Sequence, residues 1–314
     1  MNAFRLLRSI RAPGVACAFG VLTGVAVENY RNKWWKVDAA VSIIGPQGSQ
    51  DLIRSDYTPN TEKIMQHGFP TTDNIRSFQS FVLSYDRRTR NALWVYEHLT
   101  PDSLQHTKNV DRSNCEFFED TSIHPFFRSL NADYFKSGYD RGHLAPAGNN
   151  RSSKELVAQT FVLSNISPQV GKGFNRDAWN RLEQYVRYRG RKSVNTWVCT
   201  GPLFLPFPEN GKKYVRYEVI GKNHVAVPTH FFKVLLVESE PNVYELECYV
   251  MQNKPLDDNV PLQAYQVPLD SIERAAGFLI FEKVPRNVFK QINGMNPHLK
   301  KFTNLPPPKY LPKQ

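Results

Sequence analysis

The sequence predicts an α+β fold in which a mostly antiparallel central sheet is flanked by helices. Short runs rich in β-branched and aromatic residues recur between residues 81 and 250, and glycine and proline separate them. Few segments carry helical signals, and no internal repeat divides the chain. Hydrophobic residues make up 41% and charged residues 22% of the chain, a composition typical of a globular protein rather than a disordered one.

The strands are predicted from period, residue type and turn signals. Residues 81–85 and 92–96 form a hairpin around a basic turn that contains Arg87, Arg88 and Arg90. Residues 194–200 form a buried strand that ends at a Gly-Pro pair. Further strands are predicted over residues 214–220, 225–227, 231–237 and 244–250. Residues 28–75 have no sustained period and are expected to be a linker and an approach segment, so that the folded part begins around Phe78.

Three helices are predicted. The first follows Ser152, because Ser152 and Glu155 have the spacing of a capping box. The second spans about residues 175–189 and is expected to end at Gly190, a favoured residue just beyond a helix. The third covers residues 271–276.

The N-terminal residues 1–27 are interpreted as a targeting segment. They contain Arg5, Arg8 and Arg11 and no acidic residue, which is typical of a mitochondrial presequence. The apolar run over residues 14–27 is shorter than the roughly 20 residues that cross a bilayer. We expect a presequence with an apolar sorting segment; a secretory signal peptide and a short membrane anchor are the alternatives.

The chain of 314 residues is expected to have three parts. Residues 1–50 are the presequence, sorting segment and linker, residues 51–290 are the folded domain, and residues 291–314 are a basic, proline-rich tail. The mature form is expected to have no stable membrane span. The predicted location is the mitochondrion, with the intermembrane space as its compartment and release to the nucleus as a further expectation.

The chain carries a net charge of +11 and a pI near 9.4, which favours a polyanionic partner, either nucleic acid or an anionic membrane. Residues 1–27 contribute three of these charges, so the rest of the chain keeps +8. The four cysteines, Cys17, Cys115, Cys199 and Cys248, form no CxxC pair. This spacing disfavours a zinc ribbon and predicts free thiols.

The segment Asp140-Arg141-Gly142-His143 has the residue types of a catalytic site. In an extended segment Arg141 and His143 point to the same face and would enter one cleft. Gly142 between them permits a close approach of backbone or substrate. An imidazole is the usual general base near neutral pH, and a guanidinium holds a phosphate through two hydrogen bonds. An ordinary structural pair of arginine and histidine is the alternative.

A second group of residues suits a metal ion. On a regular helix Asn175, Trp179 and Glu183 share one stripe, with Asn175 and Glu183 about 12 Å apart along the axis. That separation favours Asn175 as the one direct protein ligand, while Glu183 acts through bound water, an arrangement that suits Mg²⁺. Alternatively, Asn175 caps the helix and Trp179 and Leu182 belong to the core.

Together these segments resemble the ββα-metal DNA/RNA nonspecific nucleases. The resemblance covers roughly residues 78–286, and its motifs are residues 140–143, Asn175 with Glu183 eight positions later, and the stretches 111–117, 163–169, 199–203 and 219–230. It implies a ββα-metal fold and a Mg²⁺-dependent endonuclease that cuts both DNA and RNA, with Mn²⁺ as a substitute. It also implies a homodimer and mitochondrial and apoptotic roles. A protein inhibitor is an open question.

The resemblance also implies roles for individual residues. Matching positions give a general base at His143, a direct Mg²⁺ ligand at Asn175, a residue that orients metal-bound waters at Glu183, phosphate or transition-state contacts at Arg112, Arg141 and Arg187, and a residue that shapes the site at Asn165. The aromatic residues Tyr134, Phe135, Tyr139 and Phe174 are expected either to stack on bases or to fill the core.

One segment departs from the main pattern. Residues 145–150 read Ala-Pro-Ala-Gly-Asn-Asn, which resembles a paralogous mitochondrial group with 5′–3′ exonuclease activity. That group is the alternative within the family. Two other classes stay open on the residues alone: a protein of this fold that binds nucleic acid without cutting it, and a phosphodiesterase that acts on lipid headgroups.

Overall fold

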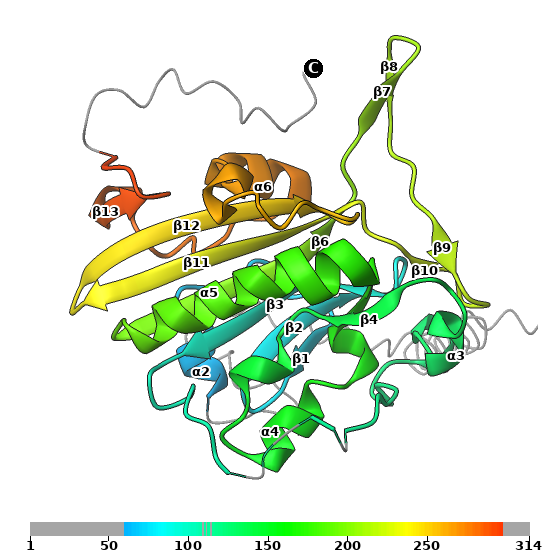
Figure 1. Cartoon of the computed structure of the whole chain (residues 1–314), viewed down its shortest axis with the longest axis horizontal. Helices are drawn as coiled ribbons and strands as arrows, with labels where there is room; N and C mark the ends of the chain where they lie inside the picture. Colours follow the sequence, from blue (N-terminus) through cyan, green and yellow to red (C-terminus); the bar gives the residue numbers. More distant parts are fainter. Residues whose placement is uncertain (1–59, 109, 111, 114, 298–314) are drawn as a thin grey trace, which may run out of the picture. The chain divides into compact units, whose positions relative to one another are not determined.

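The computed structural model describes residues 60–108, 110, 112–113 and 115–297 (Figure 1). The predicted presequence and most of the tail therefore lie outside the described residues, as does Cys17. The three described cysteines, Cys115, Cys199 and Cys248, are free thiols, as predicted. Within the described ranges, no helix has the length and apolarity needed to cross a membrane.

A seven-stranded sheet forms the centre of the described chain, in the order β1-β2-β3-β6-β11-β12-β13 (Figure 1). Its strands are β1 (Ile75–Ser77), β2 (Phe81–Asp86), β3 (Asn91–Leu99), β6 (Asn195–Leu203), β11 (His230–Glu240), β12 (Val243–Gln252) and β13 (Phe289–Ile292). Neighbours pair antiparallel except β12 and β13, which are parallel. The predicted mostly antiparallel sheet is confirmed.

The predicted hairpin is β2 and β3. Asp86 organises its turn by accepting hydrogen bonds from the backbone N–H of Arg88 and from the hydroxyl of Thr89. Arg90 has a φ of 57°, which closes the turn in the left-handed region. The basic turn is therefore built by an aspartate cap and one strained residue.

Three small two-stranded sheets lie outside the central one. They are β4 (Asp140–His143) with β5 (Ile166–Gln169), β7 (Phe207–Glu209) with β8 (Lys212–Tyr214), and β9 (Val219–Ile220) with β10 (Val225–Ala226). The single strand predicted over residues 214–220 is wrong, because residues 215–218 are exposed and form no strand. An exposed segment has no packing surface to favour the extended pairing that its β-branched and aromatic residues suggest.

The described helices are short except for one. They are α2 (Thr61–Ile64), α3 (Asn131–Tyr134), α4 (Lys154–Gln159), α5 (Trp179–Arg191) and α6 (Leu269–Ala276), with single turns at η1 (Pro125–Phe127), η2 (Ala147–Asn149), η3 (Leu163–Asn165), η5 (Leu262–Tyr265) and η6 (Arg286–Val288). A π-type segment, η4 (Gly171–Ala178), leads into α5. The predicted third helix is α6, which begins two residues early and ends at Gly277 with φ 82°.

Alternating residues of the central strands build two cores, one on each face of the sheet. On β11, Phe232 and Val234 face the core that contains Ile272 of α6. Their neighbours Phe231 and Leu235 face the core that contains Trp179 of α5. The period-2 alternation of a strand therefore places α5 and α6 on opposite faces (Figure 1).

Two predicted helix ends differ from the structure. Ser153, not Ser152, caps α4, with its hydroxyl accepting a hydrogen bond from the N–H of Leu156. Gly190 lies inside α5 and does not end it. A Cβ on Gly190 would lie 2.7 Å from Cδ1 of Leu104, so tertiary packing rather than a turn requires this glycine.

Regular structure also begins earlier than the sequence suggests. Residues 60–75, predicted to lie in an approach segment, contain α2 and the first residue of β1. Ile64 and Met65 are buried in the core beside α6, and the indole N–H of Trp197 donates to the backbone oxygen of Lys63 at 3.0 Å. These contacts, invisible in the local pattern, fix the segment to the sheet.

Candidate active site

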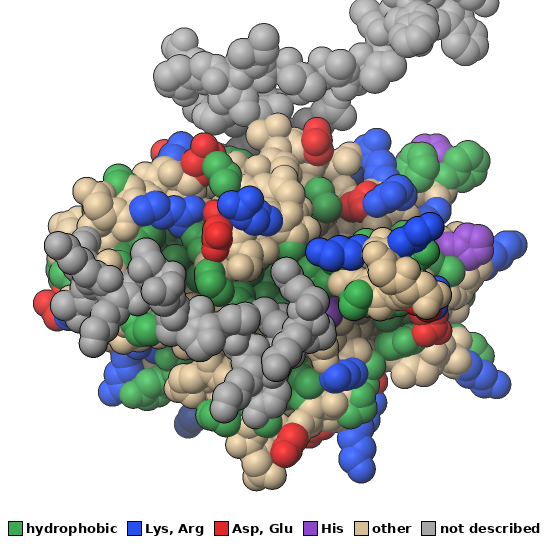
Figure 2. Space-filling model, turned by 90° about the horizontal axis from the view of Figure 1, so that it is seen from above, with side chains coloured by type: hydrophobic (Ala, Val, Ile, Leu, Met, Phe, Trp, Pro, Cys, Tyr) green, Lys and Arg blue, Asp and Glu red, His purple; other side chains and the backbone are tan. Residues whose placement is uncertain are grey.

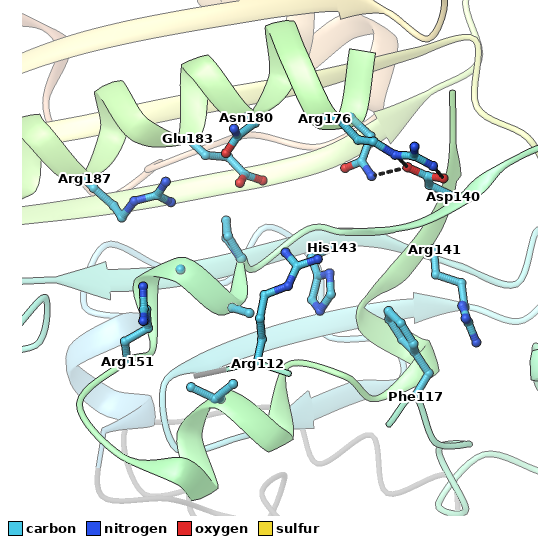
Figure 3. A pocket seen from close by; sticks show the side chains of 15 residues that line it. Arg112, Phe117, Asp140, Arg141, His143, Arg151, Arg176, Asn180, Glu183 and Arg187 are labelled. Atoms are coloured by element: carbon cyan, nitrogen blue, oxygen red, sulfur yellow. Dashed lines mark hydrogen bonds and ion pairs between the residues drawn. The ribbon is translucent and has the colours of Figure 1, made fainter. Parts of the chain in front are cut away.

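A cavity of about 510 Å³ lies between the β4 strand, the start of α5 and the segment around Arg112 (Figure 3). Six of the seven predicted site residues line it: Arg112, Arg141, His143, Asn175, Glu183 and Arg187. The cavity contains five arginines and two carboxylates, because Arg151, Arg176 and Asp140 also line it. An excess of positive charge in a concave site suits a phosphate-bearing polyanion.

His143 ends β4 and projects into this cavity (Figure 3). Its ring packs against Phe161 at a centroid distance of 4.7 Å and against Phe117 at 5.4 Å. Nε2 is buried and has no hydrogen-bond partner among the described residues. Burial, with the nearby Arg112 guanidinium, lowers the pKa of His143 to about 3. The imidazole is therefore neutral at pH 7 and able to accept a proton.

Pairing with β5 holds the His143 backbone in place. Gly142 lies opposite Ser167, and a Cβ on Gly142 would overlap the side chain of Gln169. The close approach that the sequence predicted at Gly142 is thus an approach of Gln169. This glycine lets the β4–β5 ribbon close behind His143.

Asn165 does not line the cavity, unlike the other predicted site residues. It is buried, and its amide holds the chain that follows His143: Oδ1 accepts from the N–H of Ala145 at 2.9 Å, while Nδ2 donates to the carbonyls of Ala145 and Thr160 at 3.0 and 2.8 Å. With every hydrogen-bonding group occupied by backbone, Asn165 is a positioning residue and has no free atom for substrate.

A π-type turn precedes α5 and shifts the helix register. The N–H of Trp179 donates to the carbonyl of Phe174, five residues back, so the turn holds one residue more than an α-helical turn. Trp179 is consequently buried, while Asn180 lines the cavity. The predicted stripe Asn175-Trp179-Glu183 is wrong at Trp179, and the core alternative for that residue is confirmed.

Asn175 is held by the β4 strand. Its Nδ2 donates to Oδ2 of Asp140 at 2.9 Å, and Arg176 binds the same carboxylate at 2.6 and 2.8 Å. These contacts lower the pKa of Asp140, with the hydrogen bond from Arg176 as the largest cause. Gly171 permits the pair, since a Cβ there would lie 2.9 Å from Oδ1 of Asp140. The carbonyl oxygen of Asn175 accepts no hydrogen bond from a described residue.

Glu183 lies one turn beyond Asn180 on the cavity side of α5 (Figure 3). No described residue donates a hydrogen bond to its carboxylate. Burial raises the pKa of Glu183, and the positive charges of Lys233, Arg187 and Arg112 oppose that shift. Without those cations, the carboxylate would be more strongly driven toward its neutral form.

A layer of buried polar side chains lies beneath Glu183. Glu97 of β3 accepts from Nδ2 of Asn149 at 2.9 Å, and Oδ1 of Asn149 accepts from Arg187 at 3.2 Å. Lys233 of β11 is buried, donates to the Thr200 hydroxyl at 2.6 Å and lies 5.0 Å from the centre of the Trp179 ring. This layer, which we call the charged floor (Glu97, Asn149, Thr200, Lys233), connects the sheet to the site.

Arg141 lies at the edge of the cavity rather than beside His143 (Figure 3). Its guanidinium lies 4.3 Å from the centre of the Phe117 ring, and Nη1 donates to Oδ1 of Asn131 at 2.7 Å. Both residues of the predicted pair therefore reach the same cavity, at different places. The ring of Phe117 separates the imidazole from the guanidinium.

The donor set fits a hard divalent cation. The carbonyl oxygen of Asn175 and the carboxylate of Glu183 accept no hydrogen bond from a described residue, and both residues line the cavity. Hard cations such as Mg²⁺ bind oxygen and keep several waters. Among the described residues, no cluster of three or more His, Cys, Asp or Glu residues forms a metal cage. The cavity therefore offers a divalent cation few protein ligands, and water would complete its coordination.

Several lining residues were not predicted from the sequence. Phe117, Arg151, Arg176 and Asn180 line the cavity, and Asp140 was quoted only as part of its motif. The position of Asn180 depends on the π-type turn, and those of Phe117 and Arg151 depend on long-range packing. The ion pair between Asp140 and Arg176 joins residues that are 36 positions apart, so no local sequence pattern predicts it.

A family model described as DNA/RNA non-specific endonuclease matches residues 60–287. The chain belongs to this family. It is therefore a metal-dependent nuclease that cleaves DNA and RNA without sugar specificity, and the family assignment excludes the alternatives of a non-cleaving binding protein and a lipid phosphodiesterase. The matched range contains every cavity residue described above.

Relatives within the family cover most of the chain. "Endonuclease G, mitochondrial" of Caenorhabditis elegans is 53% identical over 231 residues, 73% of this chain and 75% of that protein. The protein of that name from Homo sapiens is 45% identical over 286 residues, 88% of this chain and 95% of its own. "Nuclease EXOG, mitochondrial" of Mus musculus is 39% identical over 245 residues, 76% of this chain and 66% of its own. The higher identities favour the endonuclease G group over the paralogous one.

A solved structure agrees with the fold. A chain from the crystal structure of the EndoG/EndoGI complex superposes with a TM-score of 0.74 at 53% identity, covering 75% of this chain and 96% of that one. The ββα-metal architecture predicted from the sequence is thereby confirmed.

Proposed function

We propose that this endonuclease uses Mg²⁺, with Mn²⁺ as a substitute, and that His143 is its general base. The observation that carries the proposal is the arrangement of one cavity. A neutral imidazole lines one side, and the oxygens of Asn175 and Glu183, which accept no hydrogen bond from a described residue, line the other. A base opposite a cation site is the arrangement needed to activate water against a phosphate.

In this proposal Asn175 binds Mg²⁺ directly and Glu183 orients the waters that complete its coordination. When bound, Mg²⁺ stabilises the negative charge that develops on the phosphate. The imidazole of His143 takes a proton from the attacking water while a new P–O bond forms and the P–O bond to the leaving sugar oxygen breaks. Since His143 has a lowered pKa, it is in the proton-accepting form across the neutral range.

The arginines divide between binding and transition-state stabilisation. Arg112 and Arg187 flank His143 and Glu183 inside the cavity, while Arg141 lies at its rim (Figure 3). Phosphoryl transfer depends chiefly on positioning and charge neutralisation. We assign Arg112 and Arg187 to the scissile phosphate and Arg141 to a neighbouring one.

The cellular setting is also a proposal. The acid-free N-terminus and the relatives named as mitochondrial support a mitochondrial location, with residues 1–50 as presequence and linker, 51–290 as the nuclease domain and 291–314 as the tail. We place the enzyme in the intermembrane space, with nucleic acid processing there and apoptotic DNA degradation after release to the nucleus. A homodimer follows from the family resemblance. A protein inhibitor is supported by the similar chain solved as an EndoG/EndoGI complex.

The test is cleavage of closed circular plasmid and of single-stranded RNA by the full chain, with Mg²⁺ or with EDTA. Wild type and His124→Ala, a control at an exposed histidine, should cut both substrates in Mg²⁺ only. His143→Ala and Asn175→Ala should lose at least about a hundredfold in rate. Full activity of either variant would refute its assigned role.

The closed circle also separates the two groups within the family. An endonuclease cuts a substrate without ends, whereas a 5′–3′ exonuclease requires a free end. Residues 145–150 are the one feature that favours the paralogous group. Degradation of linear DNA with the circle intact would support that alternative.

A further inference from the structure

A second groove opens beside the catalytic cavity. It has a volume of about 540 Å³, and Asp140 and Arg141 line both spaces. Its other wall comes from α3 and the turn that follows, including Phe135 and Lys136. A strand of nucleic acid in the catalytic cavity would therefore continue into this groove past Arg141.

Phe135 is unusually exposed for its type. It has 74% of its surface accessible, although large hydrophobic side chains are normally buried. The ammonium group of Lys136 lies 5.2 Å from the centre of its ring. Of the four aromatic residues that the sequence offered for base stacking, Tyr134 and Phe174 are buried in the cores. Phe135 and the half-buried Tyr139 line the groove or its edge.

Packing and hydrogen bonds fix the backbone on both sides of Phe135. Tyr134, directly before it, is anchored in a core, and Lys136, directly after it, has a φ of 54° in the left-handed region. Ser137 closes the turn by donating through its N–H and its hydroxyl to the carbonyl of Tyr134 at 3.2 and 2.9 Å. Strained backbone held by packing is frequent where a ligand binds.

Charge in the groove matches a nucleic acid backbone. Asp140 is already paired with Arg176 and Asn175, so its carboxylate does not leave an uncompensated negative charge. Lys136 and Arg141 both line the groove and supply positive charge there. Lys and Arg side chains also lie beside exposed hydrophobic side chains over the face drawn in Figure 2. Alternation of aromatic rings and cations is the arrangement that binds single strands without sequence preference.

We propose that Phe135 is a stacking platform for an unpaired nucleobase next to the scissile phosphate, with Lys136 and Arg141 holding the flanking phosphates. The ligand class is single-stranded DNA or RNA, or a strand frayed from a duplex. The proposal rests on the nuclease function proposed above and adds a subsite to it. Every base has a π face, so stacking is compatible with cleavage that ignores sequence.

The experiment measures binding of a fluorescent single-stranded DNA 12-mer to the full chain in EDTA, so that binding is read without cleavage. Phe135→Ala should weaken binding about 5- to 100-fold, the range for loss of one stacked base. Phe135→Trp should retain affinity, whereas Phe135→Leu, apolar without a π face, should resemble Phe135→Ala. The matched control is Phe126→Ala, because Phe126 is 75% exposed and lines neither space.

A blunt duplex of the same sequence supplies the second comparison. Its affinity should change less than twofold in Phe135→Ala, because its bases already stack on one another. Equal affinity of Phe135→Ala and Phe126→Ala for the single strand would overturn the proposal. The proposal would also be overturned if Phe135→Ala lost as much affinity for the duplex as for the single strand. Absence of Mg²⁺-dependent cleavage by the wild type would instead refute the proposed function. The binding result would still test the stacking proposal, because it is measured in EDTA.

Discussion

Asp140 accepts a hydrogen bond from Nδ2 of Asn175 at 2.9 Å, and this contact decides which end of the amide faces the catalytic cavity. With nitrogen engaged by a carboxylate, the carbonyl oxygen of Asn175 is turned toward the space where a cation would bind. Arg176 completes the arrangement by holding Asp140 through both of its oxygens. The aspartate of the Asp-Arg-Gly-His segment therefore positions the proposed metal ligand, although it lies on the strand that carries the proposed base.

The first prediction concerns this contact. Asp140→Ala should raise the Mg²⁺ concentration needed for half-maximal activity by about 10- to 100-fold, the usual cost of losing a partner of a metal ligand. Excess Mg²⁺ should restore much of the rate, since His143 is untouched. Asp270→Ala, at an exposed aspartate of α6, is the control. An unchanged Mg²⁺ requirement would show that Asn175 does not need this anchor.

The second prediction concerns the ribbon behind His143. Gly142→Ala should lower the free energy of unfolding by about 1–3 kcal/mol, because the new Cβ overlaps the side chain of Gln169. Gln169→Ala removes the overlapping atoms, so the double variant should be more stable than Gly142→Ala alone. Urea unfolding of the four proteins gives the coupling energy. If the losses in unfolding free energy of the two single variants add in the double variant, the strain does not come from contact between Gly142→Ala and Gln169.

The third prediction concerns pH. The pKa of His143 is lowered to about 3, from 6.5 for a free imidazole, so the neutral base persists as pH falls through 6.5. At saturating Mg²⁺ the acidic limb of the rate should therefore lie well below pH 6.5. The imidazole NMR signals of the metal-free enzyme should show His143 unprotonated at pH 5. Titration of His143 near 6.5 would show that the site is more hydrated than the structure indicates.

The fourth prediction concerns the charged floor. Lys233→Met should cost about 3–5 kcal/mol of stability, because it removes the buried positive charge that acts most strongly on the buried Glu97 and on the half-buried Glu183. Burial raises the pKa of Glu97 to about 7, with Lys233 opposing the shift, so the variant should push that pKa higher. The double variant Lys233→Met with Glu97→Gln should recover part of the loss in thermal unfolding. If the double variant is no more stable than Lys233→Met, the charges of Lys233 and Glu97 do not stabilise each other.

Much of the fold follows from local sequence patterns. The β2–β3 hairpin and the long central strands are visible because alternating burial leaves a period in the sequence. Arg141 and His143 could be placed in one cavity because alternate residues of a strand share a face. These inferences need only the geometry of one strand and its neighbour.

Other features depend on partners far along the chain. The π-type turn arises from one hydrogen bond between Phe174 and Trp179, and the sequence of a regular helix would look the same. Gly190 has the residue type of a helix end but is required by the packing of Leu104. Asn165 has the residue type of a ligand, yet every polar atom of its side chain is bonded to backbone. Residue type alone could not distinguish these cases.

The proposed base and the proposed cation ligands lie on separate elements, His143 on the β4–β5 ribbon and Asn175 with Glu183 on η4 and α5. The Asp140 contacts with Asn175 and Arg176 are the direct side-chain bonds from β4 to η4 among the described residues. A small movement of β4 away from η4 would abolish hydrolysis while the seven-stranded sheet stays intact. Heat should therefore inactivate the enzyme several degrees below its melting temperature, and reversibly, so that a warmed sample regains activity on cooling without having to refold.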